Sequence, residues 1–267
     1  MPSRHPVRVL SIAGSDSGGG AGIQADLKAF ARCGAHGMTA MTAITAQNTV
    51  AVQSVYPLPP EAIVAQVRAV TDDIGVDGVK VGMLGDVATI EAVAESLDLV
   101  EGAPVVVDPV MVAESGGRLL AADAVDALRA LILPRATVVT PNLPEARVLA
   151  AAGEAIGAED LARAIRDLGP RAVVVTGGHA DPLVDVFYDG ERSIRIGGER
   201  HADGAAHGSG CTHSSVLAAQ LARGADPLDA ARTAREIASA AVRDGLRGIG
   251  SGPGPVDVIG LADRGGR

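Results

Sequence analysis

Aromatic side chains are scarce in this sequence: its 267 residues include two Tyr, two Phe and no Trp. The formal net charge is −9, and the lysines and arginines form no basic run. Because nucleic-acid recognition relies on basic patches and on rings that stack against bases, this composition argues against that class of partner. Apolar residues nevertheless make up 47% of the chain, so the core must be built from Ala, Val, Leu and Ile.

Cysteine is equally scarce, with Cys33 and Cys211 the only two. Two cysteines cannot form a disulfide framework, so we expect a reducing compartment. Long hydrophobic runs are also lacking, because no segment approaches the roughly 18 apolar residues that a membrane span needs. The first apolar stretch, residues 7–13, is interrupted by Arg8 and does not resemble a signal peptide. These features predict a cytoplasmic protein that does not enter a membrane.

Short apolar runs typical of buried strands recur along the chain, at residues 7–13, 38–45, 78–82, 105–107, 137–140 and 172–176. Segments with the composition or spacing of helices follow them, at residues 23–32, 60–74, 89–97, 122–133, from 141 onward and 228–246. Residues 184–188 and 193–196, joined by Asp189 and Gly190, predict a β-hairpin. This alternation predicts a single α/β domain over residues 1–267, with a mainly parallel central sheet and helices on both faces.

Glycines and polar residues gather where these predicted strands end, namely Gly14, Asp16, Gln47, Asn48, Asp108, Asn142, Glu145, Gly177 and Gly178. Ligands of doubly wound sheets bind beyond this edge, so we expect the functional site there. Two common phosphate-binding motifs are lacking. No G-x-x-x-x-G-K-[ST] occurs, and no acidic residue ends the strand that follows the glycines at 18–22, as a dinucleotide fingerprint requires.

The segment Gly208-Ser209-Gly210-Cys211 precedes an apolar run, residues 216–222, that has the composition of a helix. Small residues let the free N–H groups of a helix start approach an anion, and the helix dipole favours negative charge there. A thiol at such a position is expected to have its pKa lowered toward the thiolate, which would make Cys211 a base or a nucleophile. The alternative is a glycine-rich turn before a buried helix, with Cys211 an inert core residue.

Seven segments in order resemble the hydroxymethylpyrimidine/phosphomethylpyrimidine kinases of thiamine biosynthesis: residues 13–28, 42–49, 80–84, 107–111, 140–146, 177–179 and 207–212. The first, A-G-S-D-S-G-G-G-A-G-I-Q-A-D-L-K, matches the N-terminal signature of that family. The resemblance implies a ribokinase-like fold without a separate lid domain, usually as a homodimer. It also implies ATP- and Mg²⁺-dependent phosphorylation of 4-amino-5-hydroxymethyl-2-methylpyrimidine and then of its monophosphate, giving the pyrimidine diphosphate for thiamine biosynthesis.

The same resemblance implies roles for particular residues. It assigns the pyrimidine to Gln47, Gly14, Asp26 and Met83, and the nucleotide to Asn142, Thr176 and Gly178. It assigns Mg²⁺ to Asp108 and Glu145, the anion hole for the transferred phosphoryl group to Gly208, Ser209 and Gly210, and general-base catalysis to Cys211. In a loose, metaphosphate-like transfer the attacking hydroxymethyl group needs little help from a base, so positioning and charge stabilisation dominate.

Several of these residues have structural alternatives. Asp26 lies inside a predicted helix and could simply face solvent. Glu145 stands three residues after Asn142, the spacing of a helix-capping box, and capping is compatible with metal binding. Three histidines, His179, His207 and His213, are not spaced as a metal site with Cys211, so we expect them to be structural or to lie at a polar rim.

One position departs from the family pattern. Where these kinases commonly carry a lysine before Gly-Gly-His, this chain has Thr176, and its only lysines are Lys28 and Lys80. A hydroxyl supplies no charge, so more of the phosphate charge would fall on Mg²⁺ and on backbone N–H groups. Two other functions stay open: a pyridoxal kinase related to this family, whose substrate is also a planar heteroaromatic with a hydroxymethyl group, and a catalytically impaired pyrimidine-binding protein.

Overall fold

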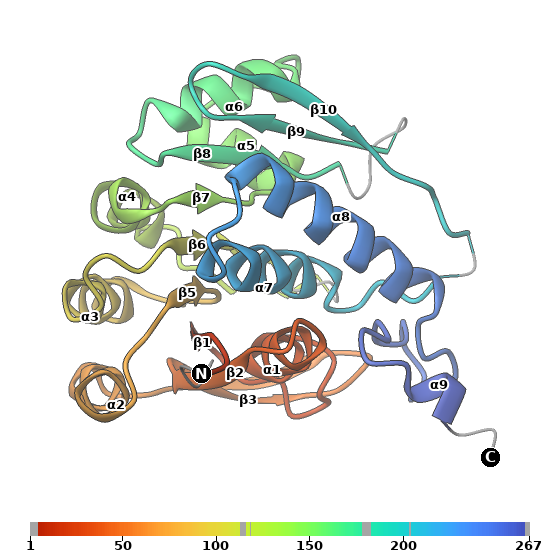
Figure 1. The fold of residues 1–267 in the computed structure, drawn as a ribbon, viewed down its shortest axis with the longest axis horizontal. Helices are drawn as coiled ribbons and strands as arrows, with labels where there is room; N and C mark the ends of the chain where they lie inside the picture. Colours follow the sequence, from red (N-terminus) through yellow and green to blue (C-terminus); the bar gives the residue numbers. More distant parts are fainter. Residues whose placement is uncertain (1–4, 113–115, 118, 178–182, 203, 265–267) are drawn as a thin grey trace.

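An eight-stranded sheet forms the centre of the computed structural model, which describes residues 5–112, 116–117, 119–177, 183–202 and 204–264. The strand order is β10-β9-β8-β7-β6-β5-β1-β2 (Figure 1). The strands are β1 (Arg8–Ala13), β2 (His36–Met41), β5 (Gly78–Val81), β6 (Val105–Val107), β7 (Val138–Val139), β8 (Ala172–Val175), β9 (Val184–Tyr188) and β10 (Ser193–Gly197). Within this sheet, neighbouring strands pair in parallel along the order β8-β7-β6-β5-β1-β2, whereas β9 runs antiparallel to both β8 and β10. The mainly parallel sheet and the β-hairpin are therefore confirmed.

Helices cover both faces of this sheet. They are α1 (Gly22–Arg32), α2 (Pro60–Asp73), α3 (Val87–Asp98), α4 (Ala124–Ala127), α5 (Leu143–Ala150), α6 (Ala158–Arg166), α7 (Ser209–Ala222), α8 (Pro227–Arg243) and α9 (Leu261–Arg264). One core cluster joins the sheet to α2–α6, and a second joins it to α1, α7 and α8. In β6, Val106 belongs to the second cluster while Val105 and Val107 belong to the first. Burial on both faces explains why the sequences of these strands are continuously apolar.

The prediction of one buried strand over residues 38–45 was wrong. β2 ends at Met41, and β3 (Ala43–Gln47) pairs with β4 (Val52–Pro57) in a separate two-stranded sheet. The chain changes direction at the buried Thr42, whose N–H donates to Ala13 O at 3.0 Å and whose Oγ1 donates to Met83 O at 2.8 Å. Apolar content alone does not reveal this break, because side chains on both sides of it are apolar.

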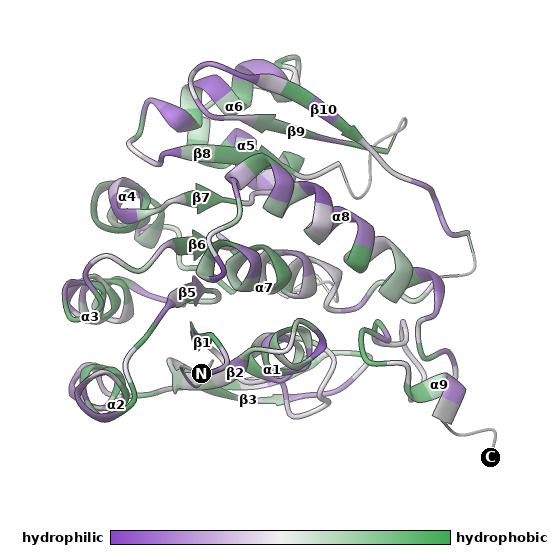
Figure 2. Ribbon diagram, in the orientation of Figure 1, coloured by the Kyte–Doolittle hydropathy of each residue, from purple (hydrophilic) through white to green (hydrophobic). Residues whose placement is uncertain are grey.

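Two helical segments also differ from expectation. Residues 122–133, predicted as one helix, form α4, then a π-helical turn, Leu128–Ile132, and a 3₁₀ turn, Leu133–Arg135. Helix α6 was missed, although its buried Leu161, Ala162 and Ile165 have helical spacing. Hydropathy colouring shows β6, β7 and β8 as apolar and α8 as mixed along its length (Figure 2). Within the described residues, no helix combines the length and apolarity that a membrane crossing requires.

Candidate active site

Gly14 and Met83 meet at the carboxyl edge of the sheet, as their assignment to one pocket requires. Gly14 directly follows β1, and a Cβ at this position would overlap the terminal methyl group of Met83, which is 9% exposed. The carbonyl of Gly14 accepts the N–H of Ile23 in α1 at 3.1 Å. Without a side chain at Gly14, the end of the Met83 side chain lies directly against the main chain, whereas a Cβ there would force that side chain to move.

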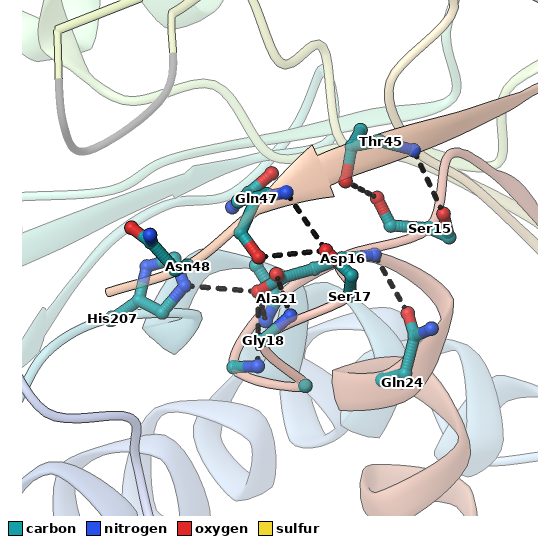
Figure 3. A network of polar contacts seen from close by, with 12 residues as sticks. Ser15, Asp16, Ser17, Gly18, Ala21, Gln24, Thr45, Gln47, Asn48 and His207 are labelled. Carbon is teal, nitrogen blue, oxygen red and sulfur yellow. Dashed lines mark hydrogen bonds and ion pairs between the residues drawn. The ribbon is translucent and has the colours of Figure 1, made fainter. Parts of the chain in front are cut away.

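Gln47 ends β3 and is tied to the glycine-rich loop after β1. Ser17 Oγ donates to the carbonyl of Gln47 at 2.7 Å, and the N–H of Gln47 donates back to Ser17 Oγ at 2.8 Å (Figure 3). The base of the same loop is held by a bond from the N–H of Asp16 to Gln24 Oε1 at 2.8 Å. These contacts engage the main chain of Gln47, so they fix its position without using its side-chain amide.

Asp26 takes part in a buried ion pair rather than facing solvent. Its carboxylate accepts bonds from Lys80 Nζ at 2.9 and 3.1 Å, from Ser11 Oγ at 2.6 Å and from Ser215 Oγ at 2.7 Å. The side chains of Asp26 and Lys80 are both 0% exposed. Both carboxylate oxygens are thus already occupied by protein groups, an arrangement that favours a structural role over binding the amino group of a pyrimidine.

Lys80 also lies close to Asp108, a carboxylate that contacts Ser214 in α7. Its Nζ lies 3.9 Å from Asp108 Oδ2, and Ser214 Oγ lies 3.1 Å from the same carboxylate oxygen. Burial alone would lower the pKa of Lys80, but the negative charges of Asp26 and Asp108, joined at high pH by that of the Cys211 thiolate, outweigh it and raise that pKa. Lys80 therefore stays positively charged, although it is completely buried.

The helix predicted after residue 208 is confirmed, and it places Cys211 in its first turn. Helix α7 begins at Ser209, with Gly208 as N-cap at φ 83°. The expected lowering of the Cys211 pKa was wrong: burial raises it to about 12, against the opposing charge of Lys80. Asp108 and Asp26 raise it further, while the N–H of Gly22 at the start of α1 favours the thiolate. Around neutral pH the site therefore contains a thiol.

The capping box predicted for residues 142–145 is confirmed. Asn142 Oδ1 accepts the N–H of Glu145 at 2.9 Å, and Glu145 Oε2 accepts the N–H of Asn142 at 2.9 Å. The other carboxylate oxygen of Glu145 accepts the N–H of Met111 at 3.3 Å. Burial, followed by the charge of Asp108, raises the pKa of Glu145 to about 8. Capping thus holds this carboxylate within the electrostatic reach of Asp108.

Two of the nucleotide candidates lie side by side. Asn142 and Thr176 form a parallel β-bridge beyond the ends of β7 and β8, and the N–H of Thr176 donates to Pro141 O at 2.8 Å. The next residue, Gly177, donates its N–H to the buried carboxylate of Asp185 in β9 at 2.9 Å. The third candidate, Gly178, and also His179, lie outside the described residues.

The residues assigned to Mg²⁺ fit that ion. Asp108 and Glu145 are two buried carboxylates, and burial is the main cause that raises the pKa of each. A cation would relieve the charge that two such groups develop on ionisation. No group of three or more His, Cys, Asp or Glu side chains in the described ranges could hold a metal. Two carboxylates suffice for Mg²⁺, which keeps several waters and takes further ligands from substrate phosphates.

Two residues of this region received no role from the sequence. Lys80 lies in the four-residue strand β5, all of whose residues are buried. Because a buried amine needs a nearby acid, this position was the signal that Lys80 takes part in an ion pair. Asp16 carried a weaker signal, an acid just before five small residues. The partners of both residues lie far away in the sequence, so spacing alone does not identify them.

A helix start beside the buried carboxylate of Asp108, with a second carboxylate, Glu145, within electrostatic reach of Asp108, is an arrangement that phosphoryl transfer can use. On a mainly parallel sheet wound on both faces and without a separate lid domain, it defines the class of this protein, a ribokinase-like kinase. Comparison with protein families narrows the class. The model described as phosphomethylpyrimidine kinase matches residues 16–257, and the chain belongs to that family.

Individual relatives agree over almost the whole chain. The hydroxymethylpyrimidine/phosphomethylpyrimidine kinase of Streptomyces coelicolor is 46% identical over 261 residues, which are 96% of each chain. The thiamine biosynthesis bifunctional protein ThiED of Geobacter sulfurreducens is 44% identical over 94% of this chain and 52% of its own length. Among solved structures, the ADP complex of Bacillus subtilis pyridoxal kinase is similar with a TM-score of 0.87 and 39% identity, covering 97% of this chain and 99% of that one.

Proposed function

We propose that this kinase transfers the γ-phosphoryl group of ATP to the hydroxymethyl oxygen of 4-amino-5-hydroxymethyl-2-methylpyrimidine. It then phosphorylates the monophosphate, giving the pyrimidine diphosphate for thiamine biosynthesis. The observation that carries the proposal is the start of α7, which holds Cys211 in its first turn and places Ser214 Oγ 3.1 Å from the buried Asp108 Oδ2, with Lys80 Nζ 3.9 Å from the same oxygen. Family membership and the names of the relatives support the choice of pyrimidine and of ATP.

Each group has a part in this reaction. The hydroxymethyl oxygen forms a bond to the γ-phosphorus while the bond from that phosphorus to the β–γ bridging oxygen breaks, and ADP leaves with the electron pair. In the proposal the N–H of Gly210, at the start of α7, donates to the transferred phosphoryl oxygens, whereas the N–H of Ser209 already donates to Ala206 O at 2.9 Å. The thiolate form of Cys211, a small fraction at neutral pH because its pKa is raised to about 12, accepts the hydroxyl proton late, as a loose transition state allows. Mg²⁺ on Asp108 and Glu145 would neutralise phosphate charge.

The two ligands lie on either side of this centre. In the proposal, the amide of Gln47 donates to and accepts from the edge of the pyrimidine ring, and Met83 packs against one face of the ring. Asn142, Thr176 and Gly178 contact the nucleotide. Because Thr176 brings no charge to the phosphates, the N–H groups at residues 208–211 take a larger share of that charge. In the proposal, Asp26 does not bind the ring, because its carboxylate already accepts hydrogen bonds from Ser11, Lys80 and Ser215.

Product analysis tests the reaction directly. The protein is incubated with ATP, Mg²⁺ and the free pyrimidine, and the products are separated by anion-exchange chromatography. We expect the monophosphate first and the diphosphate later, with one ADP formed per phosphoryl group transferred. Monophosphate alone would show that the second step is lost, and no phosphorylated product would refute the proposed function in favour of a pyrimidine-binding protein.

Pyridoxal in the same assay decides the second candidate function. The structural similarity to a pyridoxal kinase favours this alternative, since both compounds present a hydroxymethyl group on a planar heteroaromatic ring. Comparing kcat/KM for the two compounds measures which transition state the pocket stabilises better. We expect the larger value for the pyrimidine, and a clear preference for pyridoxal would replace it as the substrate.

The pH dependence of Mg²⁺ activation tests the metal assignment. Because the pKa of Glu145 is raised to about 8, this carboxyl is mostly protonated at pH 7 and must lose its proton to bind the ion. The Mg²⁺ concentration for half-maximal rate should therefore fall as pH rises from 6.5 to 8.5, by up to about tenfold per pH unit. The measurement is a Mg²⁺ titration of the ADP-forming rate at several pH values.

Glu145→Gln should weaken Mg²⁺ activation and flatten this dependence. The exposed Glu101, replaced by Gln, serves as the matched control and should behave like the unmodified protein. A half-maximal Mg²⁺ concentration that is independent of pH, or a Glu145→Gln variant with the full dependence, would contradict the assignment.

We further propose a homodimer located in the cytoplasm. Supporting the dimer, the small sheet formed by β3 and β4 exposes large apolar side chains, with Ile44 46%, Val55 40% and Tyr56 59% exposed. Ile44 and Tyr56 are paired across the two strands, and exposed apolar side chains that lie together are typical of a protein–protein interface. Sedimentation velocity measures the mass in solution and tests the dimer. The two free cysteines are compatible with the reducing cytoplasm.

A further inference from the structure

Asp16 fixes the shape of the glycine-rich loop after β1. Its Oδ1 accepts the N–H of Gly18 at 2.8 Å, and its Oδ2 accepts the N–H groups of Gly20 at 3.0 Å and Ala21 at 2.8 Å. The side chain is 1% exposed. Burial works against ionisation, but the bonds from His207, Ala21 and Gly18 outweigh it and lower the pKa of Asp16. The carboxylate is therefore charged, and it can only accept hydrogen bonds.

His207, which is distant from Asp16 in the sequence, contacts this carboxylate. Its Nε2 lies 3.1 Å from Asp16 Oδ2, across 191 positions of sequence (Figure 3). Since the carboxylate only accepts, Nε2 must be the protonated donor. The backbone of His207 is held by the C-terminal segment, donating to Gly254 O at 3.3 Å and accepting from the N–H of Val256 at 3.1 Å. His207 is thus fixed on one side before it binds Asp16 on the other.

The two loops joined by this contact also touch through their backbones. A Cβ at Gly20 would overlap the His207 ring, and a Cβ at Gly208 would overlap the carbonyl oxygen of Gly20. Gly208 is the N-cap of α7 and follows His207 directly. The hydrogen bond between His207 and Asp16 therefore sits next to the helix start that receives the phosphoryl group, and it holds the glycine-rich loop against that start.

The other side of the glycine-rich loop holds Gln47 through Ser17. We propose that His207 is a positioning residue: by donating to Asp16 it fixes the loop that carries Gln47 relative to the helix start that carries Cys211. The donor thereby sets the distance between the pyrimidine hydroxyl and the γ-phosphorus without touching either. This inference rests on the proposed function, because it takes the pyrimidine to bind at Gln47 and the phosphates at residues 208–211.

Two substitutions separate the hydrogen bond from the volume of the ring. His207→Met keeps the bulk and removes the donor, whereas His207→Gln keeps a donor near the place of Nε2. We expect His207→Met to lower kcat for the pyrimidine by about tenfold or more while KM changes by less than about threefold, because misplacement by a fraction of an ångström slows transfer more than binding. His207→Gln should retain kcat to within about threefold.

A matched control and a second readout keep the test decisive. His201, whose Nε2 lies 2.9 Å from Ser239 Oγ, is replaced by Met and should leave kcat unchanged. Amide hydrogen exchange of residues 16–21 is measured as well. His207→Met should speed this exchange, because Asp16 loses the hydrogen bond from His207. This readout needs no substrate, so it tests the contact even if the unmodified protein fails to phosphorylate the pyrimidine.

Three results would overturn the proposal. The first is a His207→Met variant with unchanged kcat. The second is an equal loss of kcat in His207→Gln and His207→Met at equal thermal stability, which would assign the effect to ring shape. The third is unchanged hydrogen exchange of residues 16–21 in His207→Met.

Discussion

Replacing Cys211 by alanine is expected to lower kcat by about 10²-fold or more, the usual contribution of a group that takes a proton in the transition state. The pyrimidine KM should change by no more than a few-fold, because the proposed contacts to the ring come from Gln47 and Met83. Single-turnover measurements of phosphoryl transfer give the rate constant of the chemical step, without interference from product release.

The pH profile of the unmodified protein should reveal the thiol. With the pKa of Cys211 at about 12, roughly one thiol in 10⁵ is ionised at pH 7, and this fraction rises about tenfold per pH unit. The rate of transfer should therefore rise between pH 7 and 9. At saturating Mg²⁺, where the titration of Glu145 no longer limits the rate, Cys211→Ala should lack that rise, because the variant has no thiol to ionise.

Cys33 supplies the matched control for this prediction. It is also a free cysteine, but it is buried in the second core cluster, whereas Cys211 is partly exposed at the start of α7. Cys33→Ala should retain kcat and the rise of rate with pH. Equal losses of kcat and of pyrimidine affinity in Cys211→Ala would assign Cys211 to packing, and an unchanged pH profile would show that another group takes the proton.

The fold could be predicted from the sequence where local pattern and burial agree. Strands such as β6 and β8 are buried on both faces, so their apolar runs are unambiguous. The turn at Asp189 and Gly190 and the capping box at Asn142 use signals that lie within four residues. The break at Thr42 could not be predicted in this way, because Thr42 donates the bonds that redirect the chain to Ala13 and Met83, which lie far from it in the sequence.

The site shows the same division between local and distant effects. The helix start at Ser209 follows from small residues before an apolar run. The sign of the Cys211 pKa shift does not, because burial together with the charges of Asp108 and Asp26 outweighs the charge of Lys80 and the hydrogen bond from the N–H of Gly22. Those neighbours lie more than 100 positions away in the sequence. A motif can therefore locate the thiol, but only the fold shows its protonation state.

Lys80→Met should be the most destabilising single change in the site. It removes the only cation that contacts the buried carboxylate of Asp26, leaving that charge and the nearby Asp108 uncompensated among the described ion pairs. Breaking one partner of a buried pair lowers the free energy of unfolding by about 3–5 kcal/mol. Because the pKa of Lys80 is raised above its ordinary 10.5, this contribution is complete below that pH and is lost only as pH rises beyond the folded pKa.

Two further variants show whether charge is the cause. Urea unfolding at pH 7.5 should give the double variant Lys80→Met/Asp26→Asn a smaller loss than Lys80→Met alone, because the double variant buries one uncompensated charge fewer. Arg195, which forms an exposed ion pair with Glu159 at 2.7 Å, is the matched surface control, and Arg195→Met should cost less than about 1 kcal/mol. If Lys80→Met is no more destabilising than Arg195→Met, then Lys80 does not stabilise the fold by compensating the buried charge of Asp26. If the double variant is less stable than Lys80→Met, the remaining hydrogen bonds of Asp26, rather than its ion pair, hold α1 to the sheet.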